Sequence, residues 1–290
     1  MQNKKKLLPN IYNFLRPKQT KNLARFGAKK DGGYIVDLNA VSKVNFLISF
    51  GMAEEFSFEI DFLNYNSSNR LQIYDHTVNH KIYLSNILKV LRRFVTFRKN
   101  LKELNKVMLE YYSFLKFIYN SNVNFFNLKI SDKIREKKEI DLDKIFSKID
   151  KSIKNIGLKI DIEGDEYKIL DKVLENSNKI NFIIIEFHET GKNNKRFINI
   201  ATKLTKIFDI IHIHGNNHES LLPDGFPKVI EMSLVNKKNN LIYTDYPKSF
   251  PIKELDFPNN PFLPDIEINF NQLAENISKP NLQATKIKRQ

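Results

Sequence analysis

Three carboxylates, Asp161, Glu163 and Asp165, surround Gly164 within the segment GLKIDIEGDEYKIL. The apolar residues before them alternate as in a strand, and the apolar residues after them recur at helical spacing. We therefore predict that a strand passes into a helix at Gly164. In open α/β sheets, ligands bind beyond the carboxyl ends of the strands, where acids can meet hydroxyls or cations.

These acids could either begin the helix or take part in a site, and their positions relative to the helix distinguish the two explanations. Asp165 and Glu166 would begin the helix, where the positive end of the helix dipole favours acids. Asp161 and Glu163 precede the helix, so this explanation fits them less well. We therefore take Asp161 and Glu163 as candidate catalytic residues.

A second group of candidates follows the segment KINFIIIEFHE (179–189), whose continuous apolar character is typical of a central parallel strand. His188 could act as a general base, since its ordinary pKa is near 6.5. It could equally be a strand-end histidine bonded to the backbone. Asp161, Glu186 and His188 could instead bind Mg²⁺ or Mn²⁺, with His212 or His214 as further ligands.

The segment FDIIHIHGNN (208–217) predicts another strand that ends in polar side chains. His214, Asn216 and Asn217 could bind hydroxyl groups of a substrate. A polar turn at Gly215 explains the same residues equally well.

The segment NFLISFGMAEEF predicts a buried strand from Phe46 to Phe50, a turn at Gly51 and a helix beginning near Glu54. A further strand at 70–77 carries Asp75. An acid at the end of the second strand of a nucleotide-binding fold takes the ribose hydroxyls, so Asp75 is a candidate for that contact.

The elements imply an α/β fold with a mostly parallel sheet. We expect one domain over 1–270 and a basic C-terminal tail over 271–290. Further elements are expected as a helical insertion at about 84–120, a third strand at 124–131, a helix at 140–149, a hairpin at 228–246 with its turn at 237–240, and an extended segment at 246–265.

The composition excludes several kinds of site. The chain of 290 residues is 41% hydrophobic and has no cysteine, which excludes disulfides, thiolate metal sites and cysteine nucleophiles. It has no apolar run of the roughly 20 residues that cross a bilayer and no signal peptide, so we expect a cytoplasmic protein without a transmembrane segment. Its net charge of +14 suggests anionic partners, although a solvated lysine-rich surface explains it as well.

The segment LKIDIEGDEYKIL resembles the signature of the FkbM family of S-adenosylmethionine-dependent methyltransferases, in its bacterial branch. The segments DGGYIV (31–36), ISFGMAEEFSFE (48–59), HIHGNN (212–217) and LDFPNNP (255–261) are also similar to this branch. The resemblance implies a Rossmann-like class I methyltransferase sheet with a C-terminal antiparallel hairpin.

The resemblance further implies methyl transfer from S-adenosyl-L-methionine to a hydroxyl of a sugar, glycan precursor or related small molecule. Asp161, Glu163 and His188 would then be catalytic. The cofactor would bind at the loop after the strand predicted at 46–50, through Ser49, Phe50, Gly51, Glu54 and Asp75. This loop departs from the family pattern, because it has a serine in place of an aspartate and no second glycine.

Two alternatives use the basic clusters at 1–30 and 89–102. One is an RNA methyltransferase, and the other is a non-catalytic module that binds nucleic acid or an anionic membrane. The chain lacks a stacking-and-basic motif of an RNA-binding fold, so a small-molecule or glycan acceptor, neutral or anionic, is the preferred partner. The sequence leaves the oligomeric state open.

Overall fold

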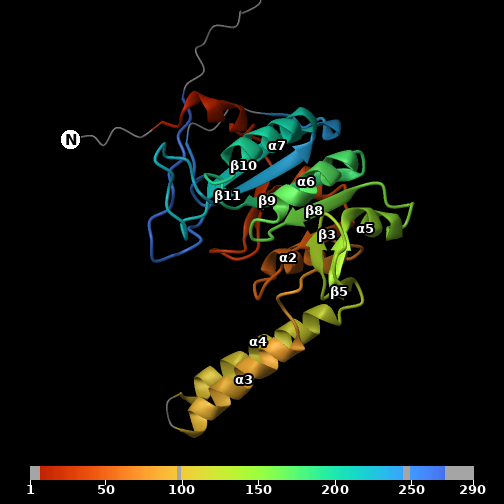
Figure 1. The fold of residues 1–290 in the computed structure, drawn as a ribbon, viewed down its shortest axis with the longest axis vertical. Helices are drawn as coiled ribbons and strands as arrows, with labels where there is room; N and C mark the ends of the chain where they lie inside the picture. Colours follow the sequence, from red (N-terminus) through yellow and green to blue (C-terminus); the bar gives the residue numbers. More distant parts are fainter. Residues whose placement is uncertain (1–6, 97–98, 244–248, 272–290) are drawn as a thin grey trace, which may run out of the picture.

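A seven-stranded sheet forms the centre of the computed structural model, which describes residues 7–96, 99–243 and 249–271 (Figure 1). Its strand order is β10-β11-β9-β8-β3-β4-β5. Only β11 runs antiparallel to its neighbours in this described sheet. The expected mostly parallel, Rossmann-like α/β sheet is confirmed. Its strands are β3 (Phe46–Phe50), β4 (Arg70–Tyr74), β5 (Val123–Phe126), β8 (Ile156–Ile160), β9 (Ile180–Phe187), β10 (Phe208–Gly215) and β11 (Ile230–Asn236).

The central strands are buried on both faces because their side chains alternate between two hydrophobic cores. Along β9, Ile183 belongs to one core and Ile184 to the other. The first core also takes residues of α5 (Leu142–Lys148), α6 (Glu166–Glu175) and α7 (Asn194–Ile207). The second takes residues of α1 (Leu38–Val41) and α2 (Ser57–Tyr65). This layering leaves the ends of the strands available for a site.

The antiparallel pairing at the C-terminal side differs from the local prediction. We expected 228–246 to fold back on itself, but β11 lies between β9 and β10 and pairs with both. A short 3-10 helix, η2 (Lys237–Asn239), follows, and residues 241–243 form no strand. The side chain of Asn236 donates to the carbonyl oxygens of Ser177 and Ile180, which fixes the end of β11 beside β9.

Two antiparallel helices occupy most of the segment where we expected a helical insertion. α3 (His80–Val95) and α4 (Leu101–Ile118) lie side by side and extend away from the sheet (Figure 1). Their boundary is set by Asn100, whose side chain accepts from the backbone of Glu103 while Glu103 accepts from the backbone of Asn100. This reciprocal cap fixes the start of α4, so the segment forms two helices and not one.

Several predicted boundaries are also corrected. The third strand divides into β5 and β6, which belong to different sheets; β6 (Lys129–Ser131) pairs with β7 (Glu139–Asp141). The helix expected near Glu54 begins at Ser57, and the one expected from 140 begins at Leu142. The N-terminal part contains η1 (Asn10–Leu15), β1 (Leu23–Phe26) and β2 (Tyr34–Asp37).

Some expectations lie outside the described residues. These are the first residues of the basic N-terminus, 1–6, and nearly all of the expected tail, 272–290, as well as part of the expected extended segment, 244–248. Within the residues that the structure describes, no helix combines the length and apolar character needed to cross a membrane.

Candidate functional site

The turn after β8 positions the first candidate residues. The backbone N–H of Asp161 donates to the carbonyl oxygen of Phe50 at 2.9 Å, which holds the end of β8 against β3. Glu163 and Gly164 then adopt left-handed φ angles of +53° and +100°. A Cβ at Gly164 would meet no atom within 4 Å, so this glycine serves the backbone conformation. The predicted passage from strand to helix is present, and α6 begins at Glu166.

Gly51 is required where the turn after β3 meets the turn after β8. A Cβ at Gly51 would lie 1.6 Å from the carbonyl oxygen of Asp161, and its φ is +76°. Lys159, buried in β8, donates to the Gly51 carbonyl oxygen at 2.9 Å and pairs with Glu59 at 3.2 Å. Ser49 donates to the same Glu59 carboxylate at 2.6 Å. Ser49 therefore belongs to a buried network beneath the turn.

Asp75 holds the loop after β3 through its carboxylate. One oxygen accepts the backbone N–H groups of Met52 and Ala53, both at 2.8 Å. The other accepts the backbone N–H and hydroxyl of Thr77, both at 2.6 Å. Burial alone would raise the pKa of Asp75, but these hydrogen bonds hold it below its ordinary value.

A cavity of about 490 Å³, here called the β3/β4 cavity, opens beside this loop. Of the candidate cofactor residues, Gly51 and Asp75 line it. Ser49 and Phe50 are completely buried, and Glu54 instead lines a separate cleft of about 820 Å³ beside α4. The cavity is also lined by Tyr74, His76, Thr77, Leu128, Lys129 and Ile162, which the sequence did not single out.

A second cavity, of about 750 Å³ and here called the β8/β9 cavity, adjoins the first. Asp161 and Glu163 line both cavities, so the two meet at the end of β8. The lining of the second cavity is strongly acidic. Against the two lysines Lys192 and Lys228, it contains the six acids Asp31, Asp161, Glu163, Glu186, Glu189 and Glu219.

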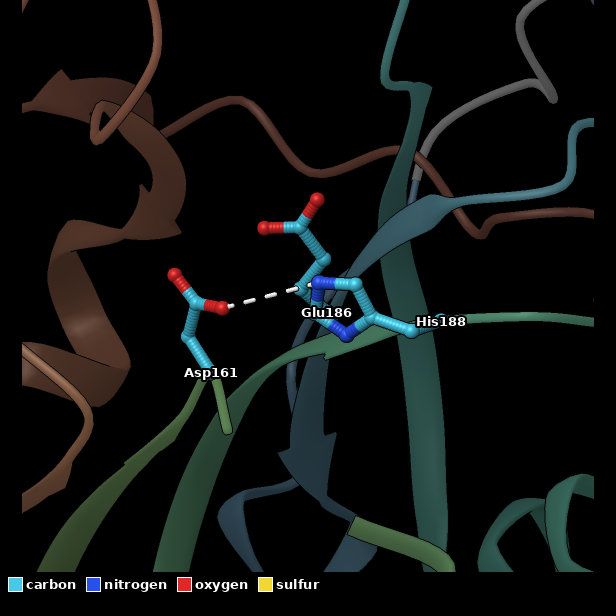
Figure 2. A group of neighbouring side chains, drawn as sticks. All are labelled: Asp161, Glu186 and His188. Atoms are coloured by element: carbon cyan, nitrogen blue, oxygen red, sulfur yellow. Dashed lines mark ion pairs between the residues drawn. The ribbon is translucent and has the colours of Figure 1, made fainter. Parts of the chain in front are cut away.

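The side chains of Asp161, Glu186 and His188 converge at this cavity (Figure 2). One ligand atom from each can be chosen so that all lie within 4.8 Å of one another. His188 Nε2 lies 3.9 Å from Asp161 Oδ1 and 3.4 Å from Glu163 Oε2. Two carboxylates and an imidazole are donors that suit Mg²⁺ or Mn²⁺. The geometry therefore fits the predicted metal ligands as well as the predicted base.

Mutual repulsion and burial shift the ionisation of these groups. Burial, followed by the charges of Asp161 and Glu231, raises the pKa of Glu186 well above its ordinary value. Burial also raises the pKa of Asp161, although Lys159 and His188 oppose that effect. Burial alone would lower the pKa of His188, but the neighbouring carboxylates, with Glu166 foremost, raise it. The raised pKa values favour protons on Glu186 and Asp161, so these groups share protons and charge with His188 at the cavity.

Glu166 has a role that the sequence did not reveal. Its carboxylate is fully buried and accepts the backbone N–H groups of His188 at 2.7 Å and Gly164 at 2.8 Å. One of its oxygens lies 3.6 Å from His188 Nδ1. Glu166 therefore connects the turn after β8 to the residue after β9. The sequence signal for Glu166 was its place in the acidic motif, and we attributed that place to a preference for acids at the start of a helix.

Tyr34 is a second residue that sequence reasoning missed. Its hydroxyl donates to Asp161 Oδ2 at 3.0 Å and fixes the orientation of that carboxylate. The segment DGGYIV contains it, but nothing in the local pattern connects a tyrosine on β2 with an acid after β8.

The predicted substrate-binding residues separate into two groups. Asn216 lines the β8/β9 cavity and donates to Glu186 Oε1 at 2.7 Å. His214 is buried, with one ring nitrogen 3.1 Å from Glu231 and the other 2.9 Å from Asp265. The Asn217 side chain donates to three backbone carbonyls between 260 and 264.

The structure thus gives His214 and Asn217 a role in holding the 256–265 segment. His212 has a similar place, with its Nε2 atom 3.0 Å from Asp256. His212, His214 and Asn217 do not line the β8/β9 cavity, so Asn216 alone of the three predicted substrate contacts lies at it. Neither of these histidines belongs to the group formed by Asp161, Glu186 and His188, so neither is placed as a further metal ligand there.

Comparisons with known proteins give matches by structure alone, since no family model and no curated protein matches the chain. A precorrin-6y C5,15-methyltransferase from Geobacter metallireducens is 11% identical, with a TM-score of 0.34, over 68% of this chain and 86% of that one. An rRNA methylase from Streptococcus thermophilus is 8% identical, with a TM-score of 0.35, over 68% and 92%. The mitomycin 7-O-methyltransferase MmcR is 9% identical, with a TM-score of 0.29, over 69% and 53%. Because these scores are low, the individual matches do not identify the fold. The Rossmann-like methyltransferase fold is identified by the strand order of the sheet, in which β11 runs antiparallel to both of its neighbours.

Proposed function

We propose that this protein transfers a methyl group from S-adenosyl-L-methionine to a hydroxyl oxygen of a sugar, glycan precursor or related small molecule. The observation that carries the proposal is the meeting of the two cavities at Asp161 and Glu163. A methyl donor in the β3/β4 cavity would face an acceptor in the β8/β9 cavity. Such placement is itself a large part of catalysis, because in-line approach replaces a random encounter.

The β3/β4 cavity would take the cofactor beside Gly51 and Asp75. An acid after the second strand of a Rossmann-like half is placed to meet ribose hydroxyls. Since Asp75 already accepts four hydrogen bonds, a ribose hydroxyl would replace the Thr77 hydroxyl at Oδ1. The two backbone bonds at the other oxygen would keep the loop in place.

His188 would act as the general base. A hydroxyl is a weak nucleophile at neutral pH, so its proton must be removed as the methyl group transfers. His188 Nε2 points to the side of Asp161 and Glu163, where the two cavities meet. Asp161 would orient the acceptor and stabilise the imidazolium, while Glu163, with 86% of its side chain exposed, would close the site.

A divalent cation is the alternative source of activation. Asp161, Glu186 and His188 would hold Mg²⁺ or Mn²⁺, and the bound ion would lower the pKa of the acceptor hydroxyl. In support, a cation would offset both the burial and the repulsion by Asp161 and Glu231 that raise the pKa of Glu186.

The acceptor is best described as neutral and rich in hydroxyls. Six acids against two lysines line the β8/β9 cavity, and those of the six that are ionised would repel phosphate or carboxylate groups. They therefore favour a neutral acceptor over the anionic one that the net charge suggested, and they disfavour an RNA backbone at this site. Asn216 supplies an amide beside Glu186 for orienting hydroxyls.

The test combines cofactor binding with methyl transfer. Calorimetry should show binding of S-adenosylmethionine, and the labelled methyl group should move to a neutral glycan or small molecule from cells that lack this protein. His188→Ala should abolish transfer with or without chelator if His188 is the base. If a cation activates the acceptor, chelation should abolish transfer and Mg²⁺ or Mn²⁺ should restore it. Absence of both cofactor binding and transfer would refute the proposal.

A further inference from the structure

The α3–α4 hairpin presents one packed side and one free side. The less exposed residues of α3 recur at Tyr83, Ile87, Val90 and Phe94. The ring of Tyr83 stacks on that of Phe114 in α4, with centroids 4.6 Å apart, so this row faces the partner helix. The corresponding less exposed residues of α4 include Leu104, Val107, Tyr111 and Leu115.

Large apolar side chains remain exposed about a quarter turn away from these packed rows. On α3 they follow the spacing i, i+4, i+7 and i+11, and α4 carries a similar row. In two antiparallel helices, rows displaced in the same rotational sense from the packed side lie on the same face of the pair. The combined apolar face consists of Leu84, Leu88, Leu91 and Val95 on α3, exposed by 46%, 53%, 40% and 68%, and Leu101, Met108 and Tyr112 on α4, exposed by 58%, 53% and 63%.

Basic residues border this apolar face along both outer edges. Continuing around each helix from the apolar row, the next positions carry lysine or arginine. The acids of the two helices, Glu103 and Glu110, lie on the opposite side from the apolar rows. The bordering basic residues are Lys81, Lys89 and Arg92 on α3 and Lys102 and Lys116 on α4, whereas Lys106 lies farther around α4 and pairs with Glu110 at 3.8 Å.

We propose that this face of the α3–α4 hairpin docks on the surface of an anionic phospholipid bilayer. Apolar side chains would enter the boundary between headgroups and acyl chains, while the basic borders meet the lipid phosphates. Each helix would lie in the plane of the interface. This orientation agrees with the finding that neither helix has the length and apolar character to cross a membrane.

The arrangement of charge favours a bilayer over two other partners. A second copy of this chain, packed through the same apolar face, would bring basic borders against basic borders. Nucleic acid would meet the basic residues but would leave the leucines and Met108 without an apolar partner. Of these three partners, the anionic bilayer is the one that complements both the apolar rows and their borders.

Co-sedimentation of the full chain with vesicles tests the proposal. Binding should be strong with a mixture of phosphatidylcholine and phosphatidylglycerol, weak with phosphatidylcholine alone, and reduced by about 0.5 M salt. Leu84→Ser combined with Leu88→Ser should weaken binding by at least about 10-fold. The matched apolar control is Ile242→Ser combined with Phe262→Ser, because these side chains are 86% and 92% exposed away from the hairpin.

A second pair of variants tests the basic border. Lys81→Glu combined with Arg92→Glu should weaken binding to anionic vesicles by at least about 10-fold. Lys137→Glu combined with Lys138→Glu is the charge-matched control, since both lysines are exposed in the loop before β7. All variants should retain their helical circular dichroism and their affinity for S-adenosylmethionine.

Three outcomes would overturn the proposal. One is failure of the full chain to bind anionic vesicles at low salt. Another is an equal loss of binding in the control variants. The third is a concentration-dependent dimer, or retention on RNA, that the Leu84 and Leu88 substitutions abolish while vesicle binding persists. Because cofactor affinity is measured on the same variants, failure here is distinguishable from failure of the proposed methyl transfer.

Discussion

Asp75 and Asp161 follow the two strands that flank β3, yet their carboxylates have different surroundings. Asp75 accepts hydrogen bonds from Met52, Ala53 and Thr77, and these bonds outweigh burial to hold its pKa below the ordinary value. A carboxylate surrounded in this way is ionised and fixed. Its main effect is to shape the loop that borders the β3/β4 cavity.

Asp161 instead faces charged groups of both signs, Lys159 and His188 as well as Glu163. Tyr34 donates to it, but burial raises its pKa, and Glu163 adds to that effect. Burial makes the negative form of such a group more costly than in water, and Lys159, His188 and Tyr34 offset part of that cost. The ends of these neighbouring strands thus combine a carboxylate that holds the backbone of a loop with one that lines both cavities.

The largest expected effect is on Asp161. Asp161→Asn keeps the shape of the side chain but removes its charge, so the rate of methyl transfer at a fixed enzyme concentration should decrease by at least about 100-fold. Transfer of a labelled methyl group to the acceptor-containing extract measures the effect. The matched control is Asp171→Asn on α6, where the side chain is 68% exposed. Full activity of Asp161→Asn, with no effect of chelator, would mean that the carboxylate is structural.

The next effect is on Asp75. Asp75→Ala leaves the loop N–H groups without their acceptor, and affinity for S-adenosylmethionine should decrease by about 5- to 150-fold, or about 1–3 kcal/mol. Calorimetry measures this change directly. Asp132→Ala is the control, since Asp132 pairs with Arg135 outside both cavities. An unchanged affinity in Asp75→Ala would exclude Asp75 from the cofactor site.

A smaller effect is expected from Glu166, which positions His188. Glu166→Gln retains one acceptor oxygen but cannot hold both backbone N–H groups, so kcat should decrease by about 10-fold while KM and cofactor affinity stay nearly unchanged. Glu175→Gln in the same helix is the control, because its side chain is 59% exposed. Equal losses in kcat and cofactor affinity would indicate general damage to the fold.

The last effect is on stability, with no effect on methyl transfer expected, and it concerns His214, a cation that pairs with two carboxylates. Burial alone would lower its pKa, but hydrogen bonds with Asp265 and Glu231 raise it to about 10. The resulting stability is fully present below the unfolded pKa near 6.5 and is lost as pH rises toward about 10. Urea unfolding between pH 6 and 9.5 should therefore show a decrease that His214→Gln makes shallower. Parallel curves for the two proteins would contradict this assignment.

The sequence predicted the elements whose signals are local. Alternating or continuous apolar residues located β3, β8 and β9, and the glycine within the acidic motif located the passage into α6. Because the ends of parallel strands share one edge, the convergence of Asp161, Glu186 and His188 also followed from the pattern.

The sequence could not predict which polar groups are already satisfied by distant partners. Ser49 is bonded to Glu59, and His214 to Asp265, 51 residues away. The position of β11 likewise depends on pairing with two strands that precede it in the chain. Such choices are made by tertiary contacts, which local spacing does not contain.

The buried lysine of β8 has a consequence for ligand entry. Burial alone would lower the pKa of Lys159, but Glu59 and Asp161 raise it, so the ammonium group remains charged beneath the Gly51 carbonyl. One cation thereby joins β8, α2 and the loop after β3 before any ligand arrives. A preorganised wall of this kind has little conformational entropy left to lose on association, and the β3/β4 cavity should therefore receive its ligand as a rigid receptor.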